Sequence, residues 1–325
     1  MADDGTSDRI MFALCIEASH QRGMGHLFRM LGFSSLLKAR GTPFLFLINA
    51  DPVAEKMLAA RHCPFRLVDL GASNGWQGEL IRRLGITLWV DDRLDTDAFH
   101  AREIKASGIP RVTFDDRGPG AALANVNVAG LAFDAREALG GAKVLRGPRY
   151  LVLNPEIARY RRRRTGPGSI LVTMGGSDTH GATVRVLEIL KSAGRGATVV
   201  VGPAFAHEAE LQSILTEAFT VKRAVPSLFE EFSRHSLAIT GGGVTPFEAN
   251  ASGLPCVVVA NEDFEIPVAR GLAAMGGAVF AGHYCEIDAS LLTRELPVAQ
   301  MSDAALSHID LHGAERVLDE IRRLL

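Results

Sequence analysis

Residues 237–260 read LAITGGGVTPFEANASGLPCVVVA. An apolar run ends in a string of glycines, a proline and a short polar stretch follow, and a second apolar run closes the segment. Apolar runs bounded by glycine turns are typical of strands, so we predict strands over 237–240 and 256–260 with a helix over 246–252 between them. Pro246 suits the first turn of that helix, because an N–H group there would have no partner inside the helix. The segment therefore predicts a strand–helix–strand unit.

The same alternation of short apolar runs and longer helical stretches extends along most of the chain and loosens only over 118–141. Runs such as FLFLIN (44–49) and TLWVD (87–91) are apolar without alternation, as expected for parallel strands covered on both faces. We therefore predict an α/β protein with doubly wound parallel sheets. Further strands are expected over 10–17, 65–70, 111–114, 169–174 and 197–202, and further helices over 27–40, 52–61, 78–84 and 179–193.

At 325 residues the chain is longer than one hydrophobic core usually supports, so we predict two domains. The stretch GPRYLVLNPEIARYRRRRTGPG separates two runs of the strand and helix pattern. The expected division is a Rossmann-like N-terminal domain over 1–155, a linker over 156–168 and a Rossmann-like C-terminal domain over 169–325. Two doubly wound domains that face each other across a cleft define the GT-B fold, in which ligands lie at the carboxyl ends of strands.

Four consecutive arginines, Arg161 to Arg164, allow two interpretations. Clustered basic residues bind phosphate groups or anionic membrane surfaces. A solvated linker face is the alternative, and we favour it because a charge run beside Gly-Pro-Gly needs no ligand to be stable.

The composition is that of an ordinary globular protein, with 47% apolar residues, 22% charged residues and a formal net charge of −2. This charge predicts no attraction to nucleic acid. The first apolar run, 11–16, is too short for a signal peptide or a transmembrane segment, so we expect a cytoplasmic protein. The four cysteines are scattered and have no histidine at a metal-ligand spacing, which favours reduced core thiols over a metal site.

The first glycine-rich loop, SHQRGMGHLFR, follows the first predicted strand. Gly23 and Gly25 allow the backbone to pass close to a ligand, and His26 stands where a helix begins. A helix N-terminus offers free N–H groups to an oxyanion, and Arg29 adds positive charge. An imidazole in such a place can act as a general base. The alternative is a structural histidine that only donates and accepts hydrogen bonds.

Two further glycine-rich turns lie in the second half of the chain. Gly175, Gly176 and Ser177 can present backbone amides to a diphosphate, or can form no more than a tight turn whose Ser177 or Asp178 caps the next helix. Glu248 lies one turn into its predicted helix, where a carboxylate can accept both ribose hydroxyls or simply stabilise a helix N-terminus. A dinucleotide fingerprint is absent from the first loop, because Phe28 stands at its third glycine position.

Two of these loops resemble a known family. Residues 242–248 (GGVTPFE) and 252–255 (SGLP) resemble the GGxTxxE…GLP block of GT-B enzymes related to the peptidoglycan N-acetylglucosaminyltransferase. The loop GMGHLFR at 23–29 resembles the Gly-x-Gly-His-x-x-Arg loop of the UDP-2,4-diacetamido-2,4,6-trideoxy-β-L-altropyranose hydrolases of pseudaminic acid biosynthesis. This closer resemblance extends over most of the chain, including VDD at 90–92 and FDD at 114–116. The chain thus resembles a divergent member of that family.

The resemblance implies a UDP-sugar hydrolase. His26 maps onto the family's catalytic histidine and would activate water for attack on the anomeric carbon as UDP leaves. Residues 169–325 would bind UDP, with Gly175, Gly176 and Ser177 at the diphosphate and Glu248 at the ribose, while residues 1–155 would hold the sugar. The other residues expected to bind nucleotide or substrate are Gly23, Gly25, Arg29, Asp91, Gly242, Gly243, Thr245 and Glu265. Diphosphate departure would need no metal and no cofactor.

The expected partner is thus a small nucleotide-sugar, in a nonulosonic acid route that feeds surface or flagellin glycosylation. Three departures from the family pattern, at Cys15, Arg93 and Phe264, fall where loops are expected to face the sugar. They motivate two alternatives, an inverting glycosyltransferase that uses an acceptor instead of water and a nucleotide-sugar binding protein without turnover.

Overall fold

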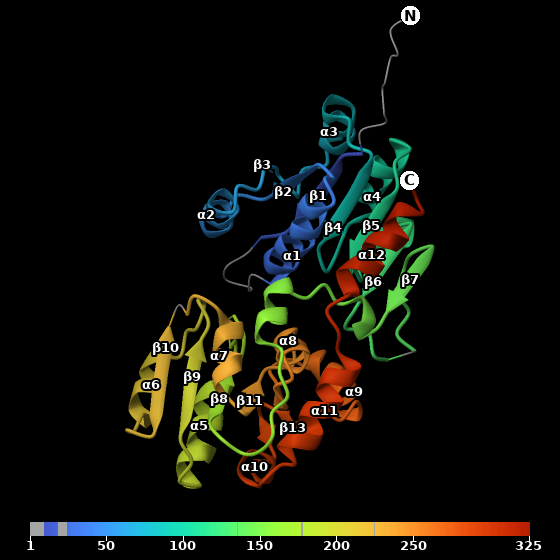
Figure 1. Cartoon of the computed structure of the whole chain (residues 1–325). Coiled ribbons are helices and arrows are strands. Elements are labelled where there is room, and N and C mark those ends of the chain that lie inside the picture. The colour runs from blue at the N-terminus through green and yellow to red at the C-terminus, as the bar shows by residue number, and fades with distance from the viewer. Residues whose placement is uncertain (1–9, 19–24, 135, 177, 224) are drawn as a thin grey trace, which may run out of the picture. The chain divides into compact units, whose positions relative to one another are not determined.

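A computed structural model describes residues 10–18, 25–134, 136–176, 178–223 and 225–325. The chain divides into two units, each built around its own parallel sheet (Figure 1). The first unit comprises His26–Val152, the first strand and His312–Leu325, and the second comprises Leu153–Leu311.

The sheet of the first unit has the strand order β3-β2-β1-β4-β5-β6-β7, and all of its neighbouring strands are parallel. The chain runs outward from β1 through β2 and β3, and then returns to place β4 on the other side of β1. The order therefore reverses between β1 and β4, which is where sheets of this type bind ligands. The elements are β1 (Phe12–Ile16), α1 (Gly25–Ala39), β2 (Phe44–Ile48), α2 (Pro52–Ala60), β3 (Phe65–Leu67), α3 (Trp76–Leu84), β4 (Leu88–Asp92), α4 (Ala98–Ala106), β5 (Arg111–Phe114), β6 (Val126–Ala129), β7 (Lys143–Arg146) and α12 (Gly313–Arg322).

The sheet of the second unit repeats this plan with the order β10-β9-β8-β11-β12-β13-β14. Among the described strands of this sheet, only the short β14 is antiparallel to its neighbour. Here β8 takes the place of β1, so the order reverses between β8 and β11. The elements are β8 (Ile170–Thr173), α5 (Ala182–Ser192), β9 (Ala197–Val201), α6 (Glu208–Ile214), β10 (Phe219–Arg223), α7 (Leu228–Arg234), β11 (Leu237–Thr240), α8 (Thr245–Ala251), β12 (Cys256–Ala260), α9 (Glu265–Ala274), β13 (Ala278–His283), β14 (Glu286–Ile287), α10 (Ala289–Thr293) and α11 (Val298–His308).

The central strands are buried along their whole length, which explains their uninterrupted apolar sequences. Every residue of β1, β4, β11 and β12 is buried. A parallel strand packed between helices on both faces has no solvent side on which polar residues would alternate. The prediction of two doubly wound, Rossmann-like sheets is confirmed.

The C-terminal helix differs from the predicted domain division, because α12 belongs to the first unit. It begins at Gly313, where an added Cβ would lie 2.0 Å from the carbonyl oxygen of Leu151. Arg316 donates a hydrogen bond of 2.9 Å to the carbonyl of Arg149. The amphipathic pattern of α12 predicts that one face of the helix is buried, but it does not predict which sheet that face covers.

The arginine run has a structural role that the solvated interpretation missed. Arg164 is 1% exposed and donates to the carbonyls of Phe232 (2.6 Å) and Ser252. Arg161 donates to the carbonyl of Leu306 at 2.7 Å. These carbonyls lie at or just beyond the C-terminal ends of α7, α8 and α11, where helices leave acceptors unpaired. Burial lowers the pKa of Arg164 to about 10.

Candidate active site

The carboxyl ends of β1 and β4 lie side by side, with Ile16 paired to Asp92 in the register of the sheet. Helix α1 begins with Gly25 and carries His26 on its first turn. Because side chains alternate along a strand, the consecutive Asp91 and Asp92 point to opposite faces of β4. Asp92 contacts α1, and Asp91 contacts the opposite side of the sheet.

His26 and Asp92 form the central contact of this edge. The Nδ1 atom of His26 lies 2.6 Å from Oδ1 of Asp92. Arg29, one turn further along α1, donates from Nε to Oδ2 of the same carboxylate at 2.9 Å. Burial disfavours the charge on Asp92, but the attraction of Arg29 and His26 outweighs it and lowers the pKa of Asp92 to about 2.

This arrangement prepares His26 for proton transfer. A carboxylate on Nδ1 favours the tautomer that carries its proton there, which leaves Nε2 free to accept a proton. The His26 side chain is 25% exposed, whereas Asp92 is fully buried. A half-buried imidazole oriented by a buried carboxylate is the arrangement of a general base.

Arg29 joins two strand ends. Its Nη1 group donates to Oδ2 of Asp115, which follows β5, while Nε and Nη2 contact Asp92. Burial opposes the charge on the guanidinium, yet the two aspartates raise the pKa of Arg29 above its ordinary value. The structure thus commits most donors of Arg29, predicted to bind substrate, to the carboxylates beside His26.

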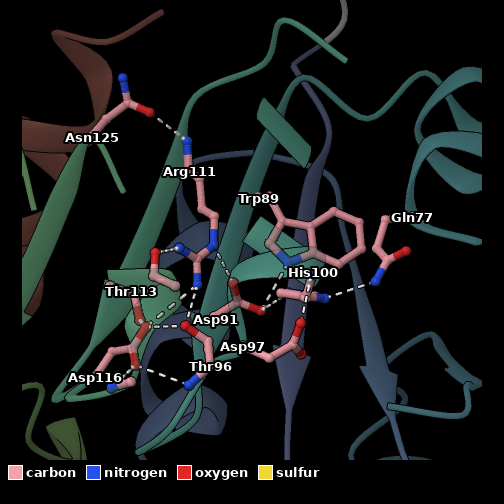
Figure 2. A network of polar contacts seen from close by, with 12 residues as sticks. Gln77, Trp89, Asp91, Thr96, Asp97, His100, Arg111, Thr113, Asp116 and Asn125 are labelled. Carbon is pink, nitrogen blue, oxygen red and sulfur yellow. Dashed lines mark hydrogen bonds and ion pairs between the residues drawn. The ribbon is translucent and has the colours of Figure 1, made fainter. Parts of the chain in front are cut away.

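Asp91 lies in the interior of the first unit, inside the polar network of Figure 2. Its carboxylate accepts from Arg111 Nε (2.6 Å), His100 Nε2 (2.9 Å) and Trp89 Nε1 (3.0 Å). Asp91 has no exposed surface, and these contacts hold its pKa well below the ordinary value, against the effect of burial. This placement argues against the substrate-binding role predicted for Asp91 and gives its neighbour Asp92 the place beside His26.

One buried group has the spacing of a metal site, since ligand atoms of Cys15, Asp91 and His100 all lie within 4.8 Å of one another. Both oxygens of Asp91 already accept from protein donors, including the guanidinium of Arg111. Burial, reinforced by Asp91, raises the pKa of the Cys15 thiol well above its ordinary value. A metal ligand is a thiolate, so the group fits a hydrogen-bonded network better than a cation site.

The second sheet presents glycine loops at the corresponding place, where β8 and β11 end with Thr173 paired to Thr240. Gly175 has a φ of +89°, and an added Cβ on it would lie 3.8 Å from Oγ1 of Thr245. An added Cβ on Gly241 would lie 3.0 Å from the carbonyl of Met174. The loop after β8 and the loop after β11 are therefore neighbours. The left-handed φ of Gly175 and the tight space at Gly241 both favour glycine.

Glu265 belongs to the same edge. Its Oε2 accepts from the backbone N–H of Gly242 at 3.1 Å and from that of Asn261 at 2.8 Å. An added Cβ on Gly243 would lie 3.7 Å from its Oε1. Burial raises the pKa of Glu265, although these N–H groups act in the opposite direction. The predicted residues Gly175, Gly242, Gly243, Thr245 and Glu265 are thus brought together.

Glu248 lies on α8, half-buried, and burial raises its pKa to about 7. Two polar atoms that the sequence did not single out are Oγ1 of Thr240, at the end of β11, and Oδ1 of Asn261, just after β12. Both are buried and have no hydrogen-bond partner within the described ranges. Unused acceptors at a strand end are a signal only three-dimensional coordinates provide.

The remaining predicted residues do not share one place in the structure. Gly23 and Ser177 lie outside the described residues. Gly25 is the exposed first residue of α1, and Gly176 accepts a hydrogen bond of 3.0 Å from the backbone of Ala204. Asp178 accepts from the amides of Ala182 (2.7 Å) and Thr183 (2.9 Å), so it caps α5 as predicted.

The three departures from the family pattern do not share one environment. Cys15 is 0% exposed and packs in the core against Leu47 and Trp89, so the expectation that it faces a sugar is wrong. Arg93 is 7% exposed, and its Nε and Nη1 groups have no acceptor among the residues that the structure describes. Phe264 is 69% exposed.

In the described part of the chain, no helix combines the length and the hydropathy needed to cross a membrane. No protein-family model matches the sequence. The chain is 25% identical to the uncharacterized protein MJ1062 of Methanocaldococcus jannaschii, covering 78% of this chain and 56% of that one. It is 23% identical to the spore coat polysaccharide biosynthesis protein SpsG of Bacillus subtilis, covering 93% of this chain and 92% of that one.

Solved structures of glycosyltransferases match over nearly the whole chain. MurG of Acinetobacter baumannii superimposes with a TM-score of 0.69 at 16% identity, covering 96% of this chain and 99% of that one. The spinosyn rhamnosyltransferase SpnG superimposes with a TM-score of 0.61 at 15% identity, covering 94% and 99%. With its two parallel sheets of the same strand order, the chain has the GT-B glycosyltransferase-like fold.

Proposed function

We propose that this protein is a nucleotide-sugar hydrolase that cleaves the anomeric C–O bond of a UDP-sugar. The products would be UDP and a free diacetamido-trideoxy sugar, as in nonulosonic or pseudaminic acid biosynthesis. The observation that carries the proposal is the contact of 2.6 Å between His26 and Asp92 at the carboxyl edge of the first sheet.

In the proposed reaction, Nε2 of His26 takes a proton from water while the water oxygen bonds to the anomeric carbon. The anomeric C–O bond breaks, and UDP leaves with its electron pair. Asp92 keeps the Nδ1 proton in place and stabilises the imidazolium that forms. The second unit would hold the nucleotide, with Glu248 at the ribose and the loops of Gly175 and Gly242 at the diphosphate.

The comparisons support a role in sugar metabolism. SpsG is by name a protein of spore coat polysaccharide biosynthesis. SpnG is by name a rhamnosyltransferase, and this chain shares the GT-B fold with both SpnG and MurG. A hydrolase on the same scaffold would use water where a transferase uses an acceptor hydroxyl, so the proposal requires a base such as His26 that can activate water.

The decisive experiment is UDP release from UDP-2,4-diacetamido-2,4,6-trideoxyhexose in water enriched in ¹⁸O. We expect the label in the free sugar, because water attacks the anomeric carbon. Label in UDP would show P–O cleavage and refute the proposed bond. Equal rates for His26→Ala and the parent protein would refute the proposed base.

The exposed Phe264 beside Glu265 favours a second candidate, an inverting glycosyltransferase whose acceptor has an apolar part. This candidate predicts slow UDP release until an acceptor alcohol is supplied. Replacing Phe264 with Ser would then raise the KM of the acceptor and leave UDP binding unchanged. UDP binding without turnover of any sugar would instead indicate a nucleotide-sugar binding protein.

A further inference from the structure

Two neighbouring strands of the first sheet each end in a pair of aspartates. Asp91 and Asp92 close β4, and Asp115 and Asp116 follow β5. In each pair one carboxylate lies in the internal network, and the other contacts Arg29 beside His26. Asp115 therefore corresponds to Asp92, on the side of the sheet that carries the proposed base.

Asp116 shows what a satisfied carboxylate at this edge looks like (Figure 2). Both of its oxygens accept hydrogen bonds, and it has no exposed surface. The donors are the backbone of Thr96 (3.0 Å), the backbone of Gly118 (2.9 Å), the hydroxyl of Thr113 (3.0 Å), the guanidinium of Arg111 (3.4 Å) and the hydroxyl of Thr96.

Asp115 is also buried, but only one of its two carboxylate oxygens accepts a hydrogen bond within the described ranges. Its side chain is 5% exposed, and its Oδ2 accepts from Arg29. Its Oδ1 is buried and accepts no hydrogen bond anywhere in the described ranges. A buried charged acceptor without a donor costs free energy, so a donor from outside the chain would be bound strongly there.

The backbone holds Asp115 in an unusual conformation. Its φ is +49°, a left-handed value that aspartate tolerates better than most residues but seldom adopts. Its N–H donates to the carbonyl of Val128 at 2.8 Å, and its carbonyl accepts from Arg117 at 2.9 Å. Such conformations persist where surrounding contacts impose them, and they concentrate at functional sites.

The charges around Asp115 define the kind of ligand. Asp92 and Asp115 share the guanidinium of Arg29, so carboxylates outnumber guanidinium groups in these contacts. Arg117, which contacts the carbonyl of Asp115, is itself paired with Glu137. An anionic group such as a phosphate would be repelled. A neutral O–H or N–H donor would pair with Oδ1 of Asp115 without adding negative charge.

We infer that Oδ1 of Asp115 binds a hydroxyl or acetamido N–H donor of the sugar and thereby positions the sugar beside His26. This inference rests on the proposed function, because it assumes that the first unit meets the sugar. Asp115 then determines specificity, since a sugar without that donor leaves the carboxylate oxygen unpaired.

The test compares four proteins on matched sugars. Asp115→Asn keeps the size of the side chain, Asp115→Ala removes it, and Asp134→Asn is the control at a partly exposed aspartate of the same unit. The probes are UDP-2,4-diacetamido-2,4,6-trideoxyhexose and analogues in which one acetamido or hydroxyl group is replaced by hydrogen. Both kcat/KM and the Kd from calorimetry are measured.

We expect Asp115→Asn to lose about 10- to 100-fold in kcat/KM on the full sugar, with unchanged affinity for UDP alone. On the one analogue that lacks the recognised donor, the kcat/KM of the parent protein should fall by a similar factor. The kcat/KM of Asp115→Asn on that analogue should be little lower than its kcat/KM on the full sugar, because the lost contact is the same. The analogue that behaves so identifies the donor as acetamido or hydroxyl.

If, for every analogue, the loss from Asp115→Asn and the loss from the missing sugar group simply add, the inference is overturned and the proposed function stays intact. If the parent binds the nucleotide-sugars without hydrolysing them, the proposed function fails, and the same comparison of Kd values still decides about Asp115. A protein that binds UDP but gains no affinity from any sugar would overturn both.

Discussion

The two sheets have the same strand order and the same point of reversal, yet their carboxyl edges differ in chemistry. The edge at β1 and β4 carries charged side chains, where Asp92 contacts His26 and Arg29, and Arg29 also contacts Asp115. The edge at β8 and β11 consists of glycine loops whose backbones approach one another. The topology therefore determines where a ligand site forms, and the loop residues determine its chemistry.

The difference also has a physical cause. Buried charges cost free energy unless they are paired, and at the charged edge Arg29 pairs with both Asp92 and Asp115. A glycine loop offers backbone N–H groups and open space instead, which suits a polyanion that brings its own charge. We therefore expect loss of catalysis from changes at the first edge and loss of nucleotide affinity from changes at the second.

The largest effect is expected from His26→Ala. Removal of the proposed base should lower kcat by about 10²- to 10⁴-fold. Affinity for UDP, measured by calorimetry, should stay within twofold, because the nucleotide is assigned to the other unit. A comparable loss of UDP affinity would contradict the division of roles between the two edges.

Asp91→Ala should damage folding more than any other single change at the first edge. It removes the nearer carboxylate partner of the buried Arg111 (2.6 Å) and leaves only the longer contact with Asp116 (3.4 Å), and it also leaves the Asp91 donors His100 and Trp89 without their acceptor, which together cost about 3–5 kcal/mol. Urea unfolding measures this loss, and Asp303→Ala, at an exposed aspartate of the second unit, is the control with an expected change under about 0.5 kcal/mol. A loss of activity at unchanged stability would return Asp91 to the substrate-binding role predicted from the sequence.

Sequence reasoning recovered the architecture because its signals are local. Apolar runs without alternation predicted the buried parallel strands. The glycines that follow these runs predicted the loops at the carboxyl ends of the strands. The gathering of Gly175, Gly242, Thr245 and Glu265 follows from adjacent strands ending at one edge.

What the sequence could not determine depends on contacts between distant residues. Asp91 and Asp92 are adjacent in an uninterrupted buried strand, so no polar alternation shows which one faces α1. The carbonyls that accept from Arg164 lie 68 and 88 residues along the chain, so the run of arginines looked solvated. The sheet covered by α12 is likewise decided by packing against Leu151, which no periodicity reveals.

Glu248→Gln tests the glycine-rich edge. An ionised carboxylate accepts ribose hydroxyls better than a neutral amide, so UDP affinity at pH 8 should fall about 10- to 100-fold. Because burial raises the pKa of Glu248 to about 7, the affinity of the parent protein should also fall as the pH drops below 7. This pH dependence should vanish in Glu248→Gln, and its persistence would show that another group is responsible.

The same pKa has a consequence for the protein without nucleotide. A folded-state pKa raised above that of the unfolded chain means that the folded state binds more protons between about pH 4.5 and 7. The stability of the parent relative to Glu248→Gln should therefore fall as the pH rises through that interval. Urea midpoints at pH 5 and pH 8 measure the difference, and an opposite trend would place a positive charge near Glu248.

The smallest effect is expected from Arg93→Met at the charged edge. Arg93 has two buried donors without acceptors among the described residues, which costs free energy. Methionine has no such donors and fills a similar space. The free energy of unfolding should rise by about 1 kcal/mol, whereas Arg163→Met, at an arginine that is half exposed, should change it by less than about 0.5 kcal/mol. A destabilised variant would show that Arg93 is paired in solution. A stabilised variant with slower turnover would show that its donors are kept for a ligand, because functional sites retain unpaired groups at the expense of stability.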